Sequence, residues 1–535
     1  MTDLQKEIER RRTFAIISHP DAGKTTLTEK LLLYGGAIQL AGSVKGKATA
    51  RHAVSDWMEL EKQRGISITS SVMQFEYNGR CINILDTPGH QDFSEDTYRT
   101  LMAADSAVMV IDGAKGIEPQ TRKLFKICAM RHIPIFTFIN KLDRDARSPY
   151  ELMEELENEF GILTYPMNWP IGSGREFKGV YDRQKGEILA YSESHKGQYR
   201  IQAIECRLGE TEKLDGLIGA RLRETLVEDI ELLDGASSEF DLAEVRAGRL
   251  SPVFFGSALM NFGVEQFLNS FLELTTSPLA RETAEDIVDP FDERFSAFVF
   301  KIQANMNRAH RDRIAFMRIC SGKFERGEEY LHVQGGKALK LAQPQQLMAQ
   351  EREIIDTAYA GDIIGVFDPG IFSIGDTVCD KDLHVCFDGI PTFAPEHFAA
   401  VERVDTMKRK QFEKGMTQIA QEGAIQMFHE PFTGVEEVIV GVVGVLQFEV
   451  LEYRLKTEYG VDVRRRALPY EQIRWIVGDT DPNSLNLTSD TRWVQDFKGN
   501  DLLLFPAEWC VRWAESKNPD LVLREFSENK SISRN

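Results

Sequence analysis

Residues 14–26 read FAIISHPDAGKTT, and this stretch decides the fold. A short apolar run at 14–17 is followed by a loop and a helical pattern, the context that a phosphate-binding loop requires. Gly23 lets backbone N–H groups approach phosphates at the start of the helix, and the small Ser18 replaces the usual first glycine. We expect Lys24 between the β- and γ-phosphates and the Thr25 hydroxyl on magnesium. The predicted nucleotide-binding residues of this loop are Ser18, His19, Pro20, Asp21, Ala22, Gly23, Lys24, Thr25 and Thr26.

The surrounding sequence predicts a mainly parallel sheet. Short apolar runs at 14–17, 82–85, 108–111 and 135–139 alternate with helical patterns, which is typical of a phosphate-loop α/β domain. Residues 72–77 instead alternate apolar and polar side chains and are joined to the next strand by Asn78-Gly79, a strong hairpin signal. We therefore expect one antiparallel strand at that edge.

The second motif, DTPGH at residues 86–90, directly follows a predicted strand. Asp86 can hold the magnesium shell, Gly89 can offer its N–H to the γ-phosphate, and His90 can orient the attacking water. The predicted catalytic residues are His90 and Lys24. The predicted nucleotide-binding residues here are Asp86, Thr87, Pro88, Gly89 and His90.

The third motif, RGISIT at residues 64–69, lies between the first two. Thr69 on a mobile loop suits closure over magnesium and the γ-phosphate, although the same residues are also compatible with a strand entrance. The predicted magnesium ligands are Thr25, Thr69 and Asp86.

The fourth motif, NKLD at residues 140–143, predicts the base. The Asp143 carboxylate can accept from guanine N1–H and the exocyclic amine, whereas adenine offers neither donor at these positions. Lys141 can lie along the base, and residues 257–259 can present N–H groups to guanine O6. The predicted base-binding residues are Asn140, Lys141, Leu142, Asp143, Ser257, Ala258 and Leu259. Four motifs in this order predict a GTPase that binds GTP and GDP with one Mg²⁺.

Composition limits the class of protein. The 535 residues suffice for three or four domains, and 42% hydrophobic and 27% charged residues are typical of a globular protein. No apolar run approaches the length of a membrane-spanning helix, no signal-peptide core follows the first residues, and seven scattered cysteines contain no Cys-x-x-Cys. We therefore expect a cytoplasmic protein with no membrane partner.

The charge argues against general nucleic-acid binding. Lys and Arg total 64 against 83 Asp and Glu, for a net charge of −19, so we expect no DNA partner. RNA contacts would have to come from the basic stretches at 45–51, 308–313, 408–410 and 464–466, although a short run of charge is usually just a solvated face.

The pattern of elements predicts three domains. Residues 1–280 form the GTPase domain, with an inserted subdomain at 144–250 that contains an acidic helical stretch at 205–244. Residues 293–390 carry short β-rich runs with glycine turns, which indicate a small closed β-barrel. Residues 391–535 predict an α+β domain with helices at 402–421 and 445–459 and strands at 435–442 and 461–463.

These motifs resemble those of the translational GTPases. The 113 residues between Asp143 and Ser257 look like the inserted subdomain of the elongation factor G branch. Residues 311–316 resemble the second-domain barrel of that superfamily, and the stretch GVVGVLQF at 441–448 resembles its third domain. The remaining length leaves no space for the two translocation domains of elongation factor G. Within this branch, three domains plus the insert look like the class II peptide chain release factors of bacteria.

That resemblance implies a ribosome-dependent GTPase of translation termination. It would promote GTP-dependent dissociation of class I release factors from the ribosome after peptide release, with the ribosome, its RNA and the class I factor as partners. A ribosomal RNA loop would align His90, and Ile66 would form half of an apolar gate whose other half is here Pro20. A monomer is expected. The alternatives are a ribosome-remodelling or protection GTPase of the same branch, and a GTP-binding regulator unrelated to translation.

Overall fold

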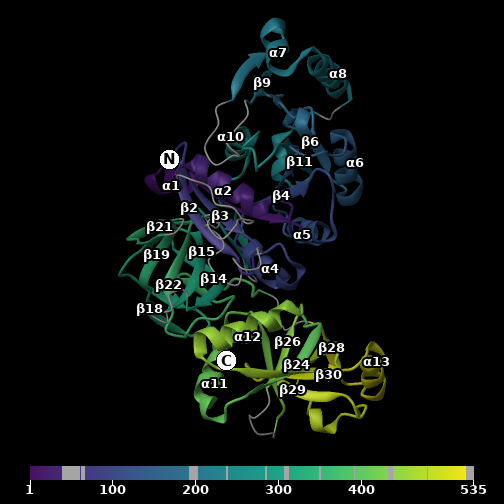
Figure 1. Ribbon diagram of the computed structural model, residues 1–535. Helices are drawn as coiled ribbons and strands as arrows, with labels where there is room; N and C mark the ends of the chain where they lie inside the picture. The colour runs from purple at the N-terminus through teal and green to yellow at the C-terminus, as the bar shows by residue number, and fades with distance from the viewer. Residues whose placement is uncertain are drawn as a thin grey trace.

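The computed structural model describes residues 1–38, 61, 67–191, 203–236, 239–283, 286–305, 312–348, 351–390, 392–431, 438–478 and 480–525. Three bodies follow one another from top to bottom in Figure 1. An α/β body drawn in purple to teal comes first, a β-rich body in green lies below it, and a C-terminal body in light green to yellow forms the base.

The α/β body is built on a seven-stranded sheet of order β2-β3-β1-β4-β5-β11-β6. Its strands are β1 (Arg11–Ser18), β2 (Ser71–Tyr77), β3 (Arg80–Asp86), β4 (Ser106–Asp112), β5 (Ile135–Asn140), β6 (Leu163–Pro166) and β11 (Leu250–Phe255). Every neighbouring pair is parallel except β2 and β3. The predicted parallel sheet with one antiparallel edge strand is confirmed.

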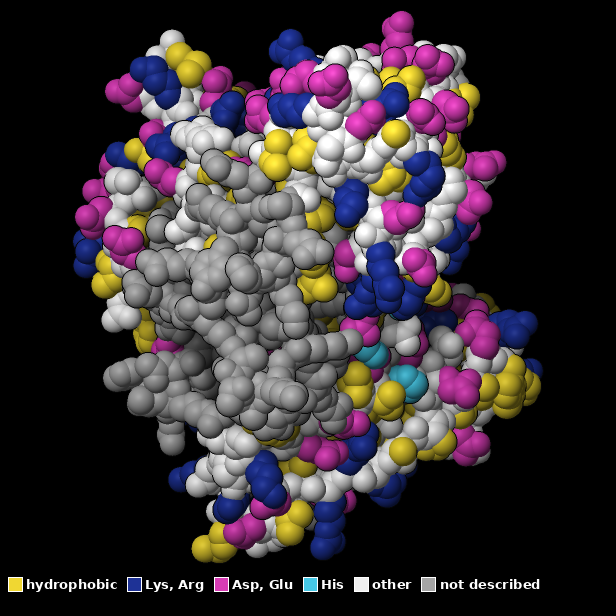
Figure 2. All heavy atoms as spheres, turned by 45° about the horizontal axis from the view of Figure 1, so that its top comes forward, with side chains coloured by type: hydrophobic (Ala, Val, Ile, Leu, Met, Phe, Trp, Pro, Cys, Tyr) yellow, Lys and Arg dark blue, Asp and Glu magenta, His cyan; other side chains and the backbone are white. Residues whose placement is uncertain are grey.

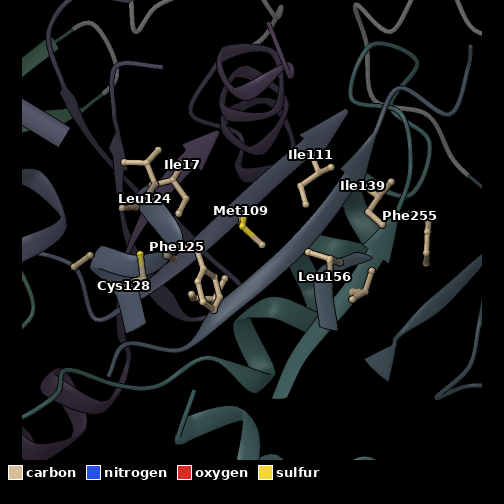
Figure 3. Close-up of a cluster of buried hydrophobic side chains, with 14 of the residues drawn as sticks. Ile17, Met109, Ile111, Leu124, Phe125, Cys128, Ile139, Leu156 and Phe255 are labelled. Carbon is tan, nitrogen blue, oxygen red and sulfur yellow. The ribbon is translucent and has the colours of Figure 1, made fainter. Parts of the chain in front are cut away.

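Helices cover both faces of this sheet. They are α2 (Lys24–Gly35), α4 (Ser94–Met102), α5 (Pro119–Met130), α6 (Pro149–Phe160) and α10 (Val264–Leu274), with a short 3₁₀ helix η1 (Gln91–Phe93) before α4. The N-terminal helix α1 (Asp3–Glu9) instead buries Ile8 in the core of the β-rich body. Because side chains alternate along a strand, Met109 of β4 joins the cluster with Leu124 and Phe125 of α5, which Figure 3 shows. Its neighbour Val108 joins the cluster on the opposite face with Phe271 of α10. Only the strand ends remain free to build a site.

The region predicted as an insertion contains a separate antiparallel sheet of order β10-β9-β8-β7. Its strands are β7 (Asn168–Ile171), β8 (Gly179–Asp182), β9 (Glu187–Ala190) and β10 (Ile204–Arg207), followed by α7 (Thr211–Ile218), α8 (Ala220–Ala236) and α9 (Leu242–Arg246); a 3₁₀ helix, η2 (Gly174–Glu176), lies between β7 and β8. Within the acidic stretch at 205–244, the predicted helices are α7, α8 and the start of α9, whereas its first residues belong to β10, which pairs with β9. Strand β6, inside the same predicted range, belongs to the main sheet beside β11.

The β-rich body contains an eight-stranded sheet of order β18-β17-β23-β14-β15-β22-β19-β20, and its described residues form no helix. The strands are β14 (Ser296–Ala304), β15 (Arg313–Ser321), β17 (Glu329–His332), β18 (Lys337–Lys340), β19 (Ala342–Met348), β20 (Glu351–Ile354), β22 (Ile363–Phe367) and β23 (Thr377–Cys379). Two ribbons accompany it, β16 (Lys323–Glu325) with β21 (Thr357–Tyr359), and β12 (Arg281–Glu282) with β13 (Ile287–Val288). The pairings among described residues leave β18 and β20 at opposite ends of the order, so closure of the barrel stays a prediction.

The C-terminal body is an antiparallel sheet of order β27-β24-β26-β25-β29-β30-β28-β31. Its strands are β24 (His397–Arg403), β25 (Gln426–His429), β26 (Val438–Val442), β27 (Val463–Leu468), β28 (Gln472–Val477), β29 (Arg492–Asp496), β30 (Asp501–Phe505) and β31 (Val522–Arg524). Its helices are α11 (Arg409–Gln421), α12 (Leu446–Tyr459) and α13 (Glu508–Lys517), with the 3₁₀ helices η3 (Thr406–Lys408) and η4 (Pro482–Ser484). Phe412 of α11 and Leu451 of α12 pack in one buried cluster with Val440 of β26.

Two predicted boundaries in this body are wrong, and a third lies partly outside the described residues. The helix expected at 402–421 begins at Arg409, because residues 397–403 are held as a strand by β26 on one side and β27 on the other. The strand expected at 461–463 begins at Val463 and extends to Leu468. Of the strand expected at 435–442, residues 435–437 lie outside the described part of the chain. The predicted helix at 445–459 is confirmed as α12.

Buried ion pairs join the β-rich body to the α/β body. Arg11 Nε lies 2.7 Å from Asp362 Oδ2, and Arg318 NH2 lies 2.5 Å from Asp105 Oδ2. All four side chains are at most 7% exposed, so breaking either pair would leave a buried charge. Within the described residues, no helix is both long enough and apolar enough to cross a membrane.

Candidate nucleotide-binding site

A cavity of about 510 Å³ opens beside the carboxyl ends of β1, β4 and β5. This volume falls within the range of small-molecule sites, and the edge where parallel strands end is where α/β sheets bind ligands. The cavity is lined by Ser18, His19, Pro20, Asp21, Gly23, Lys24, Thr25, Thr26, Ser67, Gly89, His90, Asp112, Lys115, Asn140, Lys141, Asp143, Arg144 and Leu259. Thus residues from all four predicted motifs meet in one space.

The phosphate end of the cavity is formed by the loop between β1 and α2. Gly23 has a left-handed φ of 101° and immediately precedes the helix, which begins at Lys24. A Cβ at Gly23 would lie 2.3 Å from the side-chain nitrogen of Asn140, so this position requires glycine. The first N–H groups of α2 have no intrahelical acceptor and suit an anion.

Lys24 and Asp86 form a buried ion pair at this end. Lys24 Nζ lies 2.5 Å from Asp86 Oδ1, and the two side chains are 5% and 2% exposed. Thr25 Oγ1 lies 3.5 Å from Ser67 Oγ on the neighbouring segment. An ammonium group, a carboxylate and a hydroxyl therefore lie together beside the helix N-terminus. This donor set fits a nucleotide phosphate with Mg²⁺, which prefers oxygen ligands.

Thr69 lies outside the cavity lining. Its Oγ1 lies 3.3 Å from Glu61 Oε1, and its backbone N–H donates to the same oxygen at 3.0 Å. Ser67, two residues earlier, does line the cavity. The role of Thr69 as a magnesium ligand stays a prediction, and Ile66 with its proposed gate lies outside the described residues.

Asn140 forms hydrogen bonds with three segments at the end of the cavity where the base is predicted to bind. Its Nδ2 donates to the carbonyl of Ala22 at 2.9 Å. Its Oδ1 accepts from the backbone N–H groups of Lys141 at 2.8 Å and Ala258 at 2.9 Å. One buried amide thus links the phosphate loop, the NKLD motif and the segment after β11.

Asp143 and Ser257 face each other at the same end. Ser257 Oγ donates to Asp143 Oδ1 at 2.6 Å and accepts the N–H of Met260 at 3.2 Å. The serine hydroxyl orients the carboxylate, and both Asp143 and Leu259 line the cavity. The role of Asp143 in guanine recognition stays a prediction.

His90 lines the cavity where the second motif passes it. The two residues before Gly89 do not line the cavity and instead bond to β1 and α4. Thr87 Oγ1 donates to the carbonyl of Ile16 at 2.8 Å, and the carbonyl of Pro88 accepts from Thr97 Oγ1 at 3.1 Å. The predicted site residues that do not line the cavity are Ala22, Thr69, Asp86, Thr87, Pro88, Leu142, Ser257 and Ala258.

Sequence reasoning missed Asp112, Ser67, Lys115 and Arg144, which also line the cavity. Asp112 Oδ2 lies 2.7 Å from Lys141 Nζ. Burial raises the pKa of the Asp112 carboxyl, but hydrogen bonds from Lys141 and Ala114 outweigh it and leave the pKa below its ordinary value. A signal was present, because Asp112 ends β4 as Asp86 ends β3.

Figure 2 shows histidine side chains, in cyan, close to a group of dark-blue lysine and arginine side chains at the border of the grey residues. Basic side chains on this face therefore gather locally although the whole chain is acidic. Of the predicted basic stretches, residues 45–51 and 308–311 lie outside the described part.

Family models match the chain in three consecutive segments. Residues 9–277 match the elongation factor Tu GTP binding domain, residues 294–381 match elongation factor G domain 2, and residues 387–515 match the C-terminal domain of class II release factor RF3. A protein of Symbiobacterium thermophilum named peptide chain release factor 3 is 58% identical over 98% of this chain and 99% of its own length.

The chain belongs to the peptide chain release factor 3 family. Proteins of the same name from Listeria monocytogenes and Synechococcus elongatus are each 52% identical, over 97% and 98% of this chain and 99% and 95% of their own lengths. Because residues 9–277 match a GTP-binding domain and the chain belongs to this family, it is a GTPase of translation termination. A solved structure of a Thermus thermophilus protein shares the fold, with a TM-score of 0.69 and 22% identity over 92% of this chain and 72% of that one.

Proposed function

We propose that this protein uses GTP and Mg²⁺ on the ribosome to promote departure of a class I release factor after the peptide has been freed. The observation that carries the proposal is the match to proteins named peptide chain release factor 3, which extends over both the GTPase body and the C-terminal body. The guanine-type cavity in the first body supports the choice of nucleotide.

The residues take defined roles in this proposal. Lys24 neutralises charge on the β- and γ-phosphates once it is released from Asp86, and Asp86 with the Thr25 hydroxyl holds the metal shell. The metal ion, when bound, supplies charge stabilisation on the transferred phosphoryl group. Asp143 selects guanine, and His90 orients the attacking water.

The same proposal extends to the location, the oligomeric state and the partners of the protein. We place it in the cytoplasm as a monomer, with the ribosome, ribosomal RNA and the class I factor as partners and with neither membrane nor DNA among them. The net charge of −19 supports the exclusion of DNA, because general binding to a polyanion needs the opposite sign.

The direct test is the departure rate of a fluorescently labelled class I release factor from post-termination ribosomes. Faster departure that requires both this protein and GTP supports the proposal. Unchanged departure, in the presence of ribosome-stimulated GTP hydrolysis, contradicts it.

Two further assays separate the alternatives. A remodelling or protection GTPase would displace a ribosome-bound antibiotic, which a competition assay measures. A regulator unrelated to translation would fail to co-sediment with ribosomes in a non-hydrolysable GTP analogue.

A further inference from the structure

Asp112 joins the end of β4 to the lysine of the NKLD motif. Its Oδ2 lies 2.7 Å from Lys141 Nζ, and its Oδ1 accepts the backbone N–H of Ala114 at 3.0 Å. The two carboxylate oxygens therefore serve different partners. The Asp112 side chain is only 7% exposed and the Lys141 side chain 19%, so little water competes for this ion pair.

The turn that carries Asp112 is fixed on the NKLD motif through its backbone. Gly113 N–H donates to the carbonyl of Asn140 at 2.9 Å, and the carbonyl of Gly113 accepts the N–H of Arg147 at 3.0 Å. A Cβ at Gly113 would lie only 3.1 Å from the carbonyl oxygen of Asn140, so the two segments approach closely. The carboxylate of Asp112 is therefore presented to Lys141 from a turn that is held on both sides.

Lys141 also reaches the phosphate loop. Its ammonium group donates to the carbonyl of Asp21, and its backbone N–H donates to Asn140 Oδ1 at 2.8 Å. Asp21 and Lys141 both have a left-handed backbone, with φ of 64° and 69°. Residues other than glycine adopt this conformation at a cost in free energy, and they keep it only where surrounding contacts hold them. The Lys141 ammonium group is one such contact, because it joins the two strained segments.

The two carboxylates at the base end of the cavity have separate partners. Asp143 Oδ1 accepts from Ser257 Oγ at 2.6 Å, whereas Asp112 is paired with Lys141. Within the described part of the chain, the ammonium group of Lys141 donates to Asp112 and Asp21 and not to Asp143. The ammonium group therefore leaves the Asp143 carboxylate to the base.

We propose that Asp112 is a positioning residue for nucleotide binding, which holds the Lys141 ammonium group against the phosphate loop and so keeps the stem of this side chain ready for the base. This inference rests on the proposed use of the cavity for a guanine nucleotide. A side chain that is ordered before binding does not have to be ordered by the ligand, which raises affinity. Loss of Asp112 should therefore weaken nucleotide binding and leave the rate of hydrolysis by the filled site unchanged.

Two single variants and their combination isolate the ion pair. Asp112→Asn removes the charge and puts one amide oxygen in place of the two oxygens that serve Ala114 and Lys141. Lys141→Met removes the ammonium group and keeps an unbranched stem. The matched control is Asp145→Asn, which removes the same charge further along this segment, where the side chain is exposed and does not line the cavity.

The first measurement is the affinity of the full chain for fluorescently labelled GDP, without ribosomes. Asp112→Asn should weaken binding about tenfold, as expected for loss of a hydrogen bond between charged groups. Asp145→Asn should stay within about twofold of wild type. In the Lys141→Met background, Asp112→Asn should cause no further loss, because no ammonium group is left to position. Wild-type affinity in Asp112→Asn, or the same loss in both backgrounds, would overturn the proposal.

The second measurement uses the full chain without nucleotide. An acylating reagent labels lysine amines, and mass spectrometry reports the rate of labelling at Lys141. The ammonium group must leave Asp112 and Asp21 before it can react, so Asp112→Asn should speed labelling about fivefold or more. Asp145→Asn should label at the wild-type rate. An equal rate in Asp112→Asn would contradict the claim that Asp112 holds Lys141.

The third measurement is ribosome-stimulated hydrolysis as a function of GTP concentration. In Asp112→Asn the KM should rise, and the rate at saturating GTP should stay within about twofold of wild type, which also shows that the site is folded. A fall in the saturating rate that matches the loss of affinity would overturn the positioning role. Affinity and labelling are measured without ribosomes, so failure of the wild type in the departure assay would refute the proposed function separately.

Discussion

The nucleotide cavity and the junction of the three bodies are built in opposite ways. The cavity has a volume of about 510 Å³ and is formed by loops at the ends of strands in one sheet. The junction surrounds a space of only about 60 Å³, lined by residues of all three bodies, among them Arg99, Lys301 and Arg454. The large cavity has room for a ligand to enter and leave. The tightly packed junction can instead pass a movement of one body on to the other two.

The polar contacts of the junction join distant parts of the sequence. Lys301 Nζ donates to Ser70 Oγ at 3.0 Å across 231 positions, and Arg99 NH2 donates to the carbonyl of Gly423 at 2.8 Å across 324 positions. Ser70 N–H in turn donates to Asp96 Oδ2 at 2.7 Å. The pairs Lys301–Ser70 and Arg99–Gly423 are satisfied only when the bodies are docked. The residues of the cavity thus come from one body, whereas the residues of the junction come from three bodies that are far apart in the sequence.

The largest effect is expected from His90→Ala, which removes chemistry from the cavity and leaves the junction intact. Ribosome-stimulated GTP hydrolysis should fall about 10³-fold, because the attacking water loses its orienting group. GTP affinity, measured by equilibrium titration, should stay within about twofold. His384→Ala, at an exposed position of the β-rich body, is the matched control. Equal hydrolysis by the two variants would contradict the role of His90.

A smaller effect is expected from Arg454→Met, which removes a buried ion pair of the C-terminal body beside the junction and spares the cavity. Arg454 forms two hydrogen bonds with Glu422, at 2.9 and 3.0 Å, and both side chains are at most 8% exposed. Arg454 also donates to both carboxylate oxygens of Glu458, at 2.7 and 3.0 Å. Loss of the guanidinium removes the partner of both carboxylates, which should lower the free energy of unfolding by about 3 kcal/mol. Lys456→Met on the same helix, where the side chain is 70% exposed, should change it by less than about 1 kcal/mol.

The stability of Arg454→Met should also depend on pH. Burial raises the pKa of Glu422, and the Arg454 charge opposes that rise. Without Arg454 the folded-state pKa lies further above the unfolded value, so the folded state binds the proton more tightly. Stability is then lost as pH rises through the folded-state pKa. Urea unfolding at pH 5 and pH 8 should show the larger loss at pH 8, and an equal loss at both would contradict this explanation.

Much of the first body could be predicted from sequence because its signals are local. Apolar strand runs and the residues that end them place Lys24, Asp86 and Asp143 at one edge of one sheet. Asp112 was missed because it belongs to no motif and acts through Lys141, which only the folded site brings near. The beginning of α11 was missed because pairing on both sides holds the polar residues of β24 as a strand.

The junction could not be predicted in the same way. Asp92 and Leu446, or Arg99 and Gly423, meet only after all three bodies have folded, and no residue pattern near either partner indicates the other. Local motifs identified the reaction, and tertiary structure identified what can control it.

The most direct measurement uses a substitution that changes which nucleotide drives the departure of the class I factor. In Asp143→Asn, the accepting carboxylate becomes an amide that can donate, so xanthosine triphosphate should replace GTP. We predict that wild-type protein speeds departure of the labelled factor with GTP and not with xanthosine triphosphate, and that Asp143→Asn reverses this preference. Departure that still follows GTP in the variant would contradict the claim that this cavity drives the release.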